Sequence, residues 1–123
     1  MVFRTKTSKR TMEIYEYIYQ REHLQPFALA KISIALAIRS KYRFDGENAD
    51  VAGLDLNRQT ITGEHDLLFK KLIEMNEGRS ISEEEYFPAY VKAYIDHGAV
   101  LLEQEYKYTN DIYTHLVELE KGI

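Results

Sequence analysis

Apolar positions recur with helical spacing over the first third of the chain. From Lys9 to His23 they return every three or four residues, which is the spacing of one buried helix face, and Ser8 can cap its start. From Phe27 to Arg39 nearly every side is apolar, and Pro26 suits a first helical turn. The pattern predicts helices over 9–23 and 27–39. The second is apolar enough to be central in the fold or in an oligomer.

A short strand is predicted before the first helix. Residues 2–7 are mostly β-branched or aromatic, with basic side chains at alternate positions. Because successive strand side chains point to opposite faces, Arg4 and Lys6 would share one face.

The middle of the chain is predicted to hold a long connection and then a helix. Residues 44–60 carry glycines and Asp/Asn residues typical of turns, and a loop of this length is usually functional or braced. A helix is expected from about Glu64 to Met75, ended by Gly78 as a left-handed cap. Its predicted inward positions are Leu67, Leu68, Leu72 and Ile73.

A capping box starts the next predicted helix, with Ser82 as cap and Glu85 reaching back. Apolar spacing continues to Leu102, with a local distortion expected at Pro88 and the close approach of another helix at Gly98. Thr109 or Asn110 is expected to cap a last helix that ends near Lys121. The pattern as a whole predicts one mostly α-helical domain over residues 1–123.

Composition narrows the class of protein. The 123 residues are 45% hydrophobic and 29% charged, which is typical of a globular domain. The absence of cysteine excludes disulfides, thiolate nucleophiles and cysteine-based metal sites. No signal-peptide run or membrane-length apolar stretch is present, so we expect a cytoplasmic protein without a membrane partner.

Charge divides the chain into two opposite parts. Residues 1–43 hold nine Lys/Arg and three Asp/Glu, whereas residues 44–123 hold seven Lys/Arg and seventeen Asp/Glu, within a net charge of −4. This asymmetry favours a basic binding face in front of an acidic body. The alternative is a charged surface that is simply uneven.

The order strand, helix, helix is that of ribbon–helix–helix DNA readers, in which two chains pair their strands and the ribbon enters the major groove. In this interpretation Arg4 and Lys6 face the bases, and the helix over 27–39 forms the dimer core. The alternative is an N-terminal strand with incidental charges. The predicted DNA-binding residues are Arg4, Lys6, Lys9, Arg10, Lys41 and Arg43.

Three other basic residues are weaker DNA-binding candidates: Arg58, Lys70 and Lys71. Lys70 and Lys71 form a basic pair of the kind that most often lies on a solvated helix face. Asn57 and Arg58 are predicted to be mainly structural and to anchor the 44–60 connection, with a DNA phosphate as the alternative partner of Arg58.

No catalytic motif, Gly-rich phosphate loop or cofactor site is visible in the sequence. Glu64, His65 and Asp66 resemble a metal-ligand cluster, but adjacent helical residues do not face one another, and acidic residues are also favoured at a helix start. We therefore predict no metal and no enzyme activity. A DNA-nicking role would depend on these residues together with Asp96 and His97.

Two blocks of residues carry a family resemblance. The first is Gly53, then Asn57-Arg58-Gln59-Thr60, then Gly63-Glu64-His65-Asp66 before a helix. The second is Phe87, then the stretch from Ile95 through Asp96 to Gly98. With Thr7-Ser8-Lys9 and the apolar second helix, they resemble the DndE family of DNA sulfur modification proteins over roughly residues 3–105. Residues 106–123, with the predicted last helix, lie outside the resemblance.

This resemblance implies a non-catalytic DNA-binding accessory subunit of the bacterial DNA phosphorothioation machinery. It implies partners: a cysteine desulfurase, a PAPS-reductase-like enzyme, an ATPase and double-stranded DNA, in particular nicked duplex. It also implies a homo-oligomer, a tetramer in this family. The alternatives are a DNA-nicking subunit and a ribbon–helix–helix transcriptional regulator.

Overall fold

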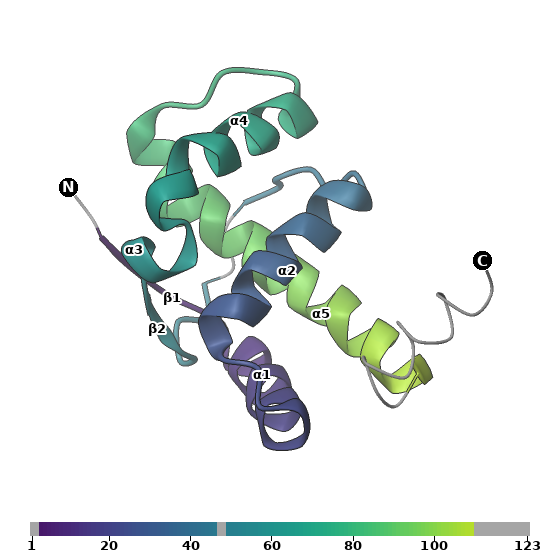
Figure 1. The fold of residues 1–123 in the computed structure, drawn as a ribbon. Helices are drawn as coiled ribbons and strands as arrows, with labels where there is room; N and C mark the ends of the chain where they lie inside the picture. The colour runs from purple at the N-terminus through teal and green to yellow at the C-terminus, as the bar shows by residue number, and fades with distance from the viewer. Residues whose placement is uncertain (1–2, 47–48, 110–123) are drawn as a thin grey trace.

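The computed structural model describes residues 3–46 and 49–109. Helices dominate this part of the chain, with two very short strands near its N-terminus (Figure 1). In chain order the elements are β1 (Arg4–Lys6), α1 (Lys9–Glu22), α2 (Pro26–Arg39), β2 (Asp55–Asn57), α3 (Arg58–Ile61), a 3-10 turn (Gly63–His65), α4 (Asp66–Glu77), a π-helical segment (Glu85–Tyr90) and α5 (Val91–Thr109).

The predicted first strand and first two helices are confirmed. Ser8 caps α1, since its hydroxyl accepts a hydrogen bond from the Thr11 amide, and His23 ends the helix in the left-handed conformation. Pro26 stands in the first turn of α2, as its missing N–H favours.

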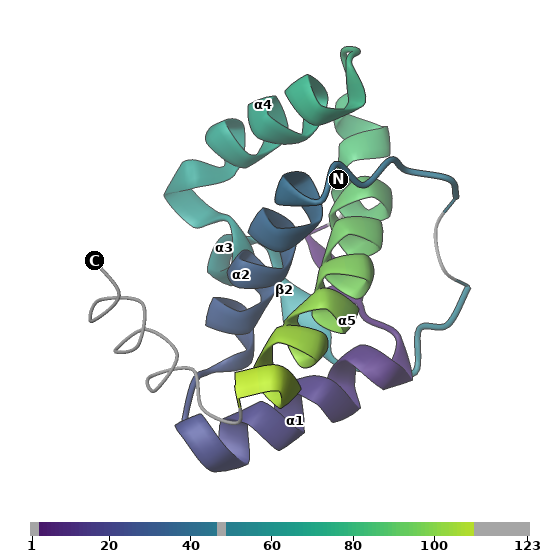
Figure 2. The same cartoon turned by 90° about the vertical axis from the view of Figure 1, so that its right-hand side faces the viewer.

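α2 and α5 lie side by side at the centre of the molecule (Figures 1 and 2). A Cβ atom on Gly98 of α5 would lie 1.8 Å from the Ser33 carbonyl oxygen of α2, so only glycine permits this approach. The close helix contact predicted at Gly98 is therefore confirmed. Ser33, Ile34 and Ala37 of α2 are fully buried, as is Ala99 of α5.

β1 pairs antiparallel with β2 of the same chain, in the register Arg4 with Asn57, Thr5 with Leu56 and Lys6 with Asp55. The long connection predicted over residues 44–60 thus contains a strand that the pattern does not reveal. It also corrects the ribbon model: the strand–helix–helix order is present, but the two-stranded ribbon is built within one chain, whereas that model pairs the strands of two chains.

α4 buries only part of the face predicted to turn inward. Ile73 is fully buried, but Leu67 and Leu68 are 67% and 55% exposed, so the prediction that these two leucines face inward is wrong. Leu72 is half-buried, so the elements packed against α4, α2 among them, cover only the C-terminal part of the predicted apolar face. Gly78 ends α4 with a φ of 76°, as predicted.

The capping box at Ser82 is confirmed: the Glu85 amide donates to the Ser82 hydroxyl over 3.2 Å, and the Glu85 carboxylate accepts from the Ser82 amide over 3.5 Å. The helix is interrupted where a distortion was expected, because Phe87 before Pro88 has an extended backbone. Of the two predicted caps for a last helix, Thr109 is the last residue of α5, whereas Asn110 and the helix to Lys121 lie outside the described residues. In the described ranges, no helix is long and apolar enough to cross a membrane.

Candidate nucleic-acid interface

β1 presents Arg4 and Lys6 to solvent and turns Thr5 inward, where Thr5 is only 4% exposed. The two basic side chains therefore share an exposed face, as strand alternation predicts. Arg4 Nε donates to Asp55 Oδ1 on β2 over 2.9 Å. No ion pair involves Lys6 in the part of the chain that the structure describes, so its charge is available to a ligand.

Lys9 and Arg10 continue this surface on the first turn of α1, and both are exposed. The Lys9 amide donates to Asp50 Oδ2 over 3.1 Å, and Arg10 Nη2 pairs with Glu103 Oε1 over 2.7 Å. Cations at a helix N-terminus oppose the helix dipole, which phosphate or a carboxylate there would offset. We call Arg4, Lys6, Lys9 and Arg10 the N-terminal basic edge.

A buried ion pair fixes this edge to the core. Asp96 Oδ1 accepts hydrogen bonds from the Ser8 amide over 3.1 Å and from the Thr11 hydroxyl over 2.7 Å. Asp96 Oδ2 accepts from Lys92 Nζ over 2.6 Å, and the same ammonium donates to the Asp50 carbonyl over 2.8 Å. One pair on α5 thus holds both the start of α1 and the 44–60 connection.

Sequence reasoning missed this anchor. Its only signal is the spacing of Lys92 and Asp96, which places the two residues on one helix face and is common on solvated helices. In the structure Lys92 is 2% exposed and Asp96 is 9% exposed. The spacing does not predict this burial, which makes the Lys92–Asp96 pair an internal contact and not a surface one.

The ion pairs of the basic edge differ from this anchor in exposure. The side chains of Arg4 and Asp55 are 56% and 46% exposed, and that of Arg10 is 63% exposed beside a 20% exposed Glu103. Exposed pairs of this kind contribute about 0–1 kcal/mol. Their arginines can therefore exchange a carboxylate for a phosphate at little cost to stability.

Lys41 and Arg43 do not join the N-terminal basic edge. They follow the end of α2, which lies away from β1 (Figure 1). Lys41 takes a positive φ of 62°, and Arg43 Nη1 donates to the Glu77 carbonyl at the end of α4 over 3.1 Å. The structure places the two residues as a separate basic group beside α4.

Arg58 points inward, with a side chain that is 12% exposed. Its Nε and Nη2 atoms bind Asp66 Oδ1 and Oδ2 over 3.0 and 2.6 Å, and Nη2 also lies 2.5 Å from Glu83 Oε1. The guanidinium carbon lies 5.2 Å from the centre of the Tyr86 ring. The hydrogen bonds to Asp66 raise the pKa of Arg58 above its ordinary value. This geometry fits the structural role predicted for Arg58.

The same contacts act on Asp66. Burial alone raises the pKa of this carboxyl group, but the hydrogen bonds from Arg58 and Thr62 outweigh burial and lower it below its ordinary value. Thr62 Oγ1 lies 2.5 Å from Asp66 Oδ1. Asn57, also predicted to be structural, caps α3 by accepting a hydrogen bond from the Gln59 amide over 2.7 Å.

Lys70 and Lys71 point in different directions. Lys70 Nζ lies 3.5 Å from Glu83 Oε2 and belongs to the partly buried group around Arg58. Lys71 has a 65% exposed side chain and lies 3.4 Å from Glu74 Oε1. The structure thus leaves Lys71 as the more accessible of the two.

The residues on which a DNA-nicking role would depend are dispersed. Asp66 is bound by Arg58, and Asp96 is buried against Lys92. Glu64 and His65 are exposed at the start of α4, whereas His97 of α5 stacks on Tyr42, just after the end of α2, at 4.2 Å between ring centres. Across the described residues, no group of three His, Asp or Glu side chains is arranged to hold a metal ion.

Comparison with known proteins relates this arrangement to a family. The family model for DNA sulphur modification protein DndE matches residues 4–110. No curated protein matches the sequence. The fold resembles the crystal structure of DndE from Escherichia coli B7A, described as involved in DNA phosphorothioation modification, with a TM-score of 0.66 and 17% identity over 83% of this chain and 97% of that chain. A DndE mutant gives a TM-score of 0.63 and 17% identity, over 85% and 99% of the two chains. The chain described here therefore belongs to the DndE family of DNA sulphur modification proteins.

Proposed function

We propose that this chain is a non-catalytic DNA-binding accessory subunit of the phosphorothioation machinery. The observation that carries the proposal is the N-terminal basic edge, four exposed cations on β1 and the first turn of α1. The buried Lys92–Asp96 pair holds the backbone beneath them. A preformed cationic edge is what a phosphate backbone of fixed spacing requires.

The acidic balance of the chain limits the affinity that one copy can reach. Asp50, Asp55 and Glu103 all lie within hydrogen-bonding distance of groups of the basic edge. Each phosphate contact must displace or tolerate one of these carboxylates. We therefore propose that double-stranded DNA is bound weakly by one chain and more tightly by several copies acting together.

Exposed apolar residues support such a homo-oligomer. Leu67, Leu68 and Met75 of α4 are 67%, 55% and 76% exposed, and Phe27 and Ile32 of α2 are 42% and 38% exposed. Burying one such side chain yields about 1.5–3 kcal/mol. Association through these helices would leave the basic edge free and multiply it.

DNA binding is tested by fluorescence anisotropy with labelled intact and nicked duplexes at several salt concentrations. We expect binding that weakens with salt and is tighter for the nicked duplex. The double substitution Arg4→Ala and Lys6→Ala should lower the salt slope by up to about 1.8, since each phosphate contact contributes about 0.9. Lys70→Ala with Lys71→Ala is the matched control. If the control loses binding and the first variant does not, the DNA lies on α4 and the proposal fails.

The non-catalytic role is tested with supercoiled plasmid in the presence of magnesium or manganese. We expect the plasmid to remain supercoiled. Nicking that disappears in Asp66→Asn would contradict the proposal and would identify an enzyme.

Association is tested by light scattering. Leu67→Glu with Leu68→Glu should reduce the measured mass to that of one chain without loss of helical circular dichroism, because both side chains are exposed. A wild-type chain that is monomeric at high concentration would contradict the oligomer. Binding to the desulfurase, the PAPS-reductase-like enzyme and the ATPase is expected as for other members of this machinery, and co-purification of the four proteins tests it.

A further inference from the structure

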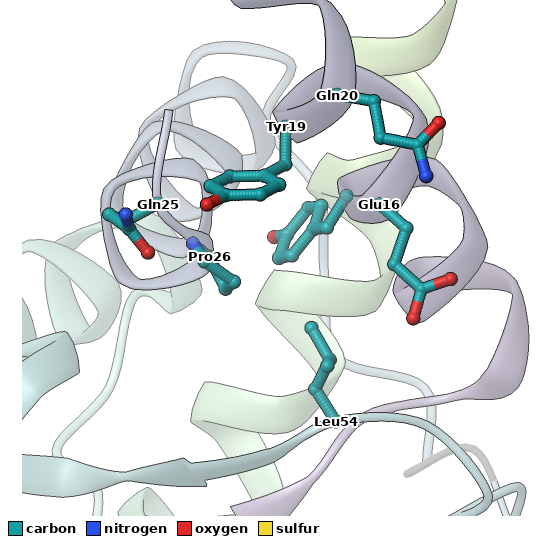
Figure 3. Close-up of a pocket in the computed structure, with 7 residues that line it drawn as sticks. Glu16, Tyr19, Gln20, Gln25, Pro26 and Leu54 are labelled. Carbon is teal, nitrogen blue, oxygen red and sulfur yellow. The ribbon is translucent and has the colours of Figure 1, made fainter. Parts of the chain in front are cut away.

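A hollow of about 400 Å³ lies between the second half of α1 and the start of α2, with Leu54 below it (Figure 3). It is separate from the N-terminal basic edge, and none of its lining residues is cationic. Glu16 and Gln20 line it from α1, and Gln25 and Pro26 line it from the opposite side. Tyr15 and Tyr19 supply aromatic rings.

The floor of the hollow is held rigidly. Tyr15 is fully buried, and its hydroxyl lies 2.5 Å from the Ser33 hydroxyl of α2. Leu54 is fixed by its backbone, which donates to the Thr7 hydroxyl over 2.9 Å and accepts from the Thr7 amide over 2.8 Å. A ligand would therefore meet a preformed apolar surface and lose little free energy in ordering it.

The rim carries acceptor groups that are not in use. Glu16, Gln20 and Gln25 are exposed, and within residues 3–46 and 49–109 no hydrogen bond or ion pair involves their side chains. Gln25 precedes α2 without capping it. The rim thus offers one carboxylate and two amide oxygens beside the 41% exposed ring of Tyr19.

We infer that this hollow binds an arginine side chain of a protein partner. A guanidinium has five donors and no acceptor, it pairs with carboxylates, and its flat faces stack on aromatic rings. The hollow supplies the matching set: Glu16 for the charge, the glutamine oxygens for the remaining donors, and Tyr19 for stacking. Its only charged lining residue is an acid, which would repel the phosphates of a nucleic acid.

This inference is independent of DNA binding, because it concerns another surface and a ligand of opposite charge. It assigns the chain two faces: a cationic edge for phosphate, and a carboxylate-bearing hollow for a basic segment of a protein. An accessory subunit with both can hold DNA while attached to another protein.

The test is a nuclear magnetic resonance titration of the full chain with N-acetyl-arginine amide at constant ionic strength. We expect amide shifts at Tyr19, Gln20 and Leu54 with millimolar affinity. The neutral analogue N-acetyl-citrulline amide has nearly the same shape and should bind about three- to fivefold more weakly, as should arginine amide to Glu16→Gln. Glu13→Gln removes an exposed carboxylate of the same helix outside the hollow and should bind like wild type.

Three results would overturn the inference. The first is equal binding of the arginine and citrulline probes, which would show that charge is not recognised. The second is an absence of shifts at these residues up to tens of millimolar arginine probe. The third is deoxycytidine shifting the same residues when the arginine probe does not, which would assign the hollow to a nucleobase.

Discussion

Arginines in this chain bind carboxylates in two opposite surroundings, exposed and largely buried. Arg4 and Arg10 pair with Asp55 and Glu103 at the surface, where the arginine side chains are 56% and 63% exposed. Arg58 binds Asp66 through two nitrogens, and its side chain is 12% exposed. Residue type and partner type are the same in both groups, so burial decides what the pair can do.

The difference separates a binding role from a structural one. Water screens an exposed pair, which can therefore open for a competing phosphate. Removing one member of a buried pair leaves the other desolvated and uncompensated, which is strongly destabilising. The difference fits the proposed ligand-binding role of Arg4 and Arg10, whereas the contacts of Arg58 join α3, α4 and the Glu83 turn.

The largest expected effect is that of Arg58→Met. This change keeps an unbranched apolar side chain over Tyr86 but leaves Asp66 without its cation and Glu83 with Lys70 alone. We expect a loss of about 2–3 kcal/mol in the free energy of unfolding, less than the loss of about 3–5 kcal/mol for a fully buried pair, because Glu83 is 43% exposed. Urea denaturation at pH 7 measures it.

Arg39→Met is the matched control for this change. Arg39 is 70% exposed and lies 3.4 Å from Glu105, so its loss should change the free energy of unfolding by less than about 0.5 kcal/mol. Equal losses of stability in the two variants would contradict the distinction between buried and exposed ion pairs. If Arg58→Met kept its stability but lost DNA binding, Arg58 would have to be assigned a DNA-binding role.

A smaller effect is expected in the acid range. The pKa of Asp66 is lower in the folded chain than its ordinary value of 3.8, so the folded state binds this proton less tightly than the unfolded state. The stability that Asp66 contributes is therefore present above about pH 4 and is lost as the pH falls through its folded pKa. We expect Asp66→Asn to be less stable than wild type at pH 6, and the gap to narrow below pH 4. Thermal unfolding across this pH range measures the gap, and a constant gap would contradict the ionic role.

The smallest expected effect on stability is that of Glu103→Gln, which releases Arg10. Because the Arg10 side chain is exposed, the free energy of unfolding should change by about 0.5 kcal/mol or less. DNA affinity should rise about two- to threefold at low salt, since one competing carboxylate is gone. Glu105→Gln makes the same charge change beside Arg39 and should leave affinity closer to wild type. An equal rise in both variants would indicate a general charge effect.

Local signals in the sequence predicted the helical elements well. The cap at Ser8, proline at the start of α2, the left-handed Gly78 and the Ser82 box each depend on neighbours within a few residues, so periodicity and turn chemistry reveal them. A glycine inside a helix costs stability, so Gly98 indicates that the position needs a residue without a side chain.

Local patterns do not predict which distant segments of the chain pack together. β2 is three residues long and has no run of β-branched residues, so only its pairing with β1 makes it a strand. Leu67 and Leu68 share the helical spacing of the buried Ile73 but are exposed, because spacing alone does not reveal which part of an apolar face a neighbouring element covers. Arg4, Lys6, Lys9 and Arg10 were predicted together because they are close in sequence, whereas Lys41 and Arg43 were added by charge alone.

The contacts that join the start of α1 to α5 affect the order in which the fold forms during synthesis. Arg10 and Glu103 are 93 positions apart, and Ser8 and Asp96 are 88 positions apart. Contacts this distant in sequence slow folding relative to helical bundles with local contacts. During synthesis, residues 1–43, with nine basic and three acidic residues, emerge before residues 44–123. The nascent segment is therefore a polycation, and it acquires its buried anchor only after α5 has been translated.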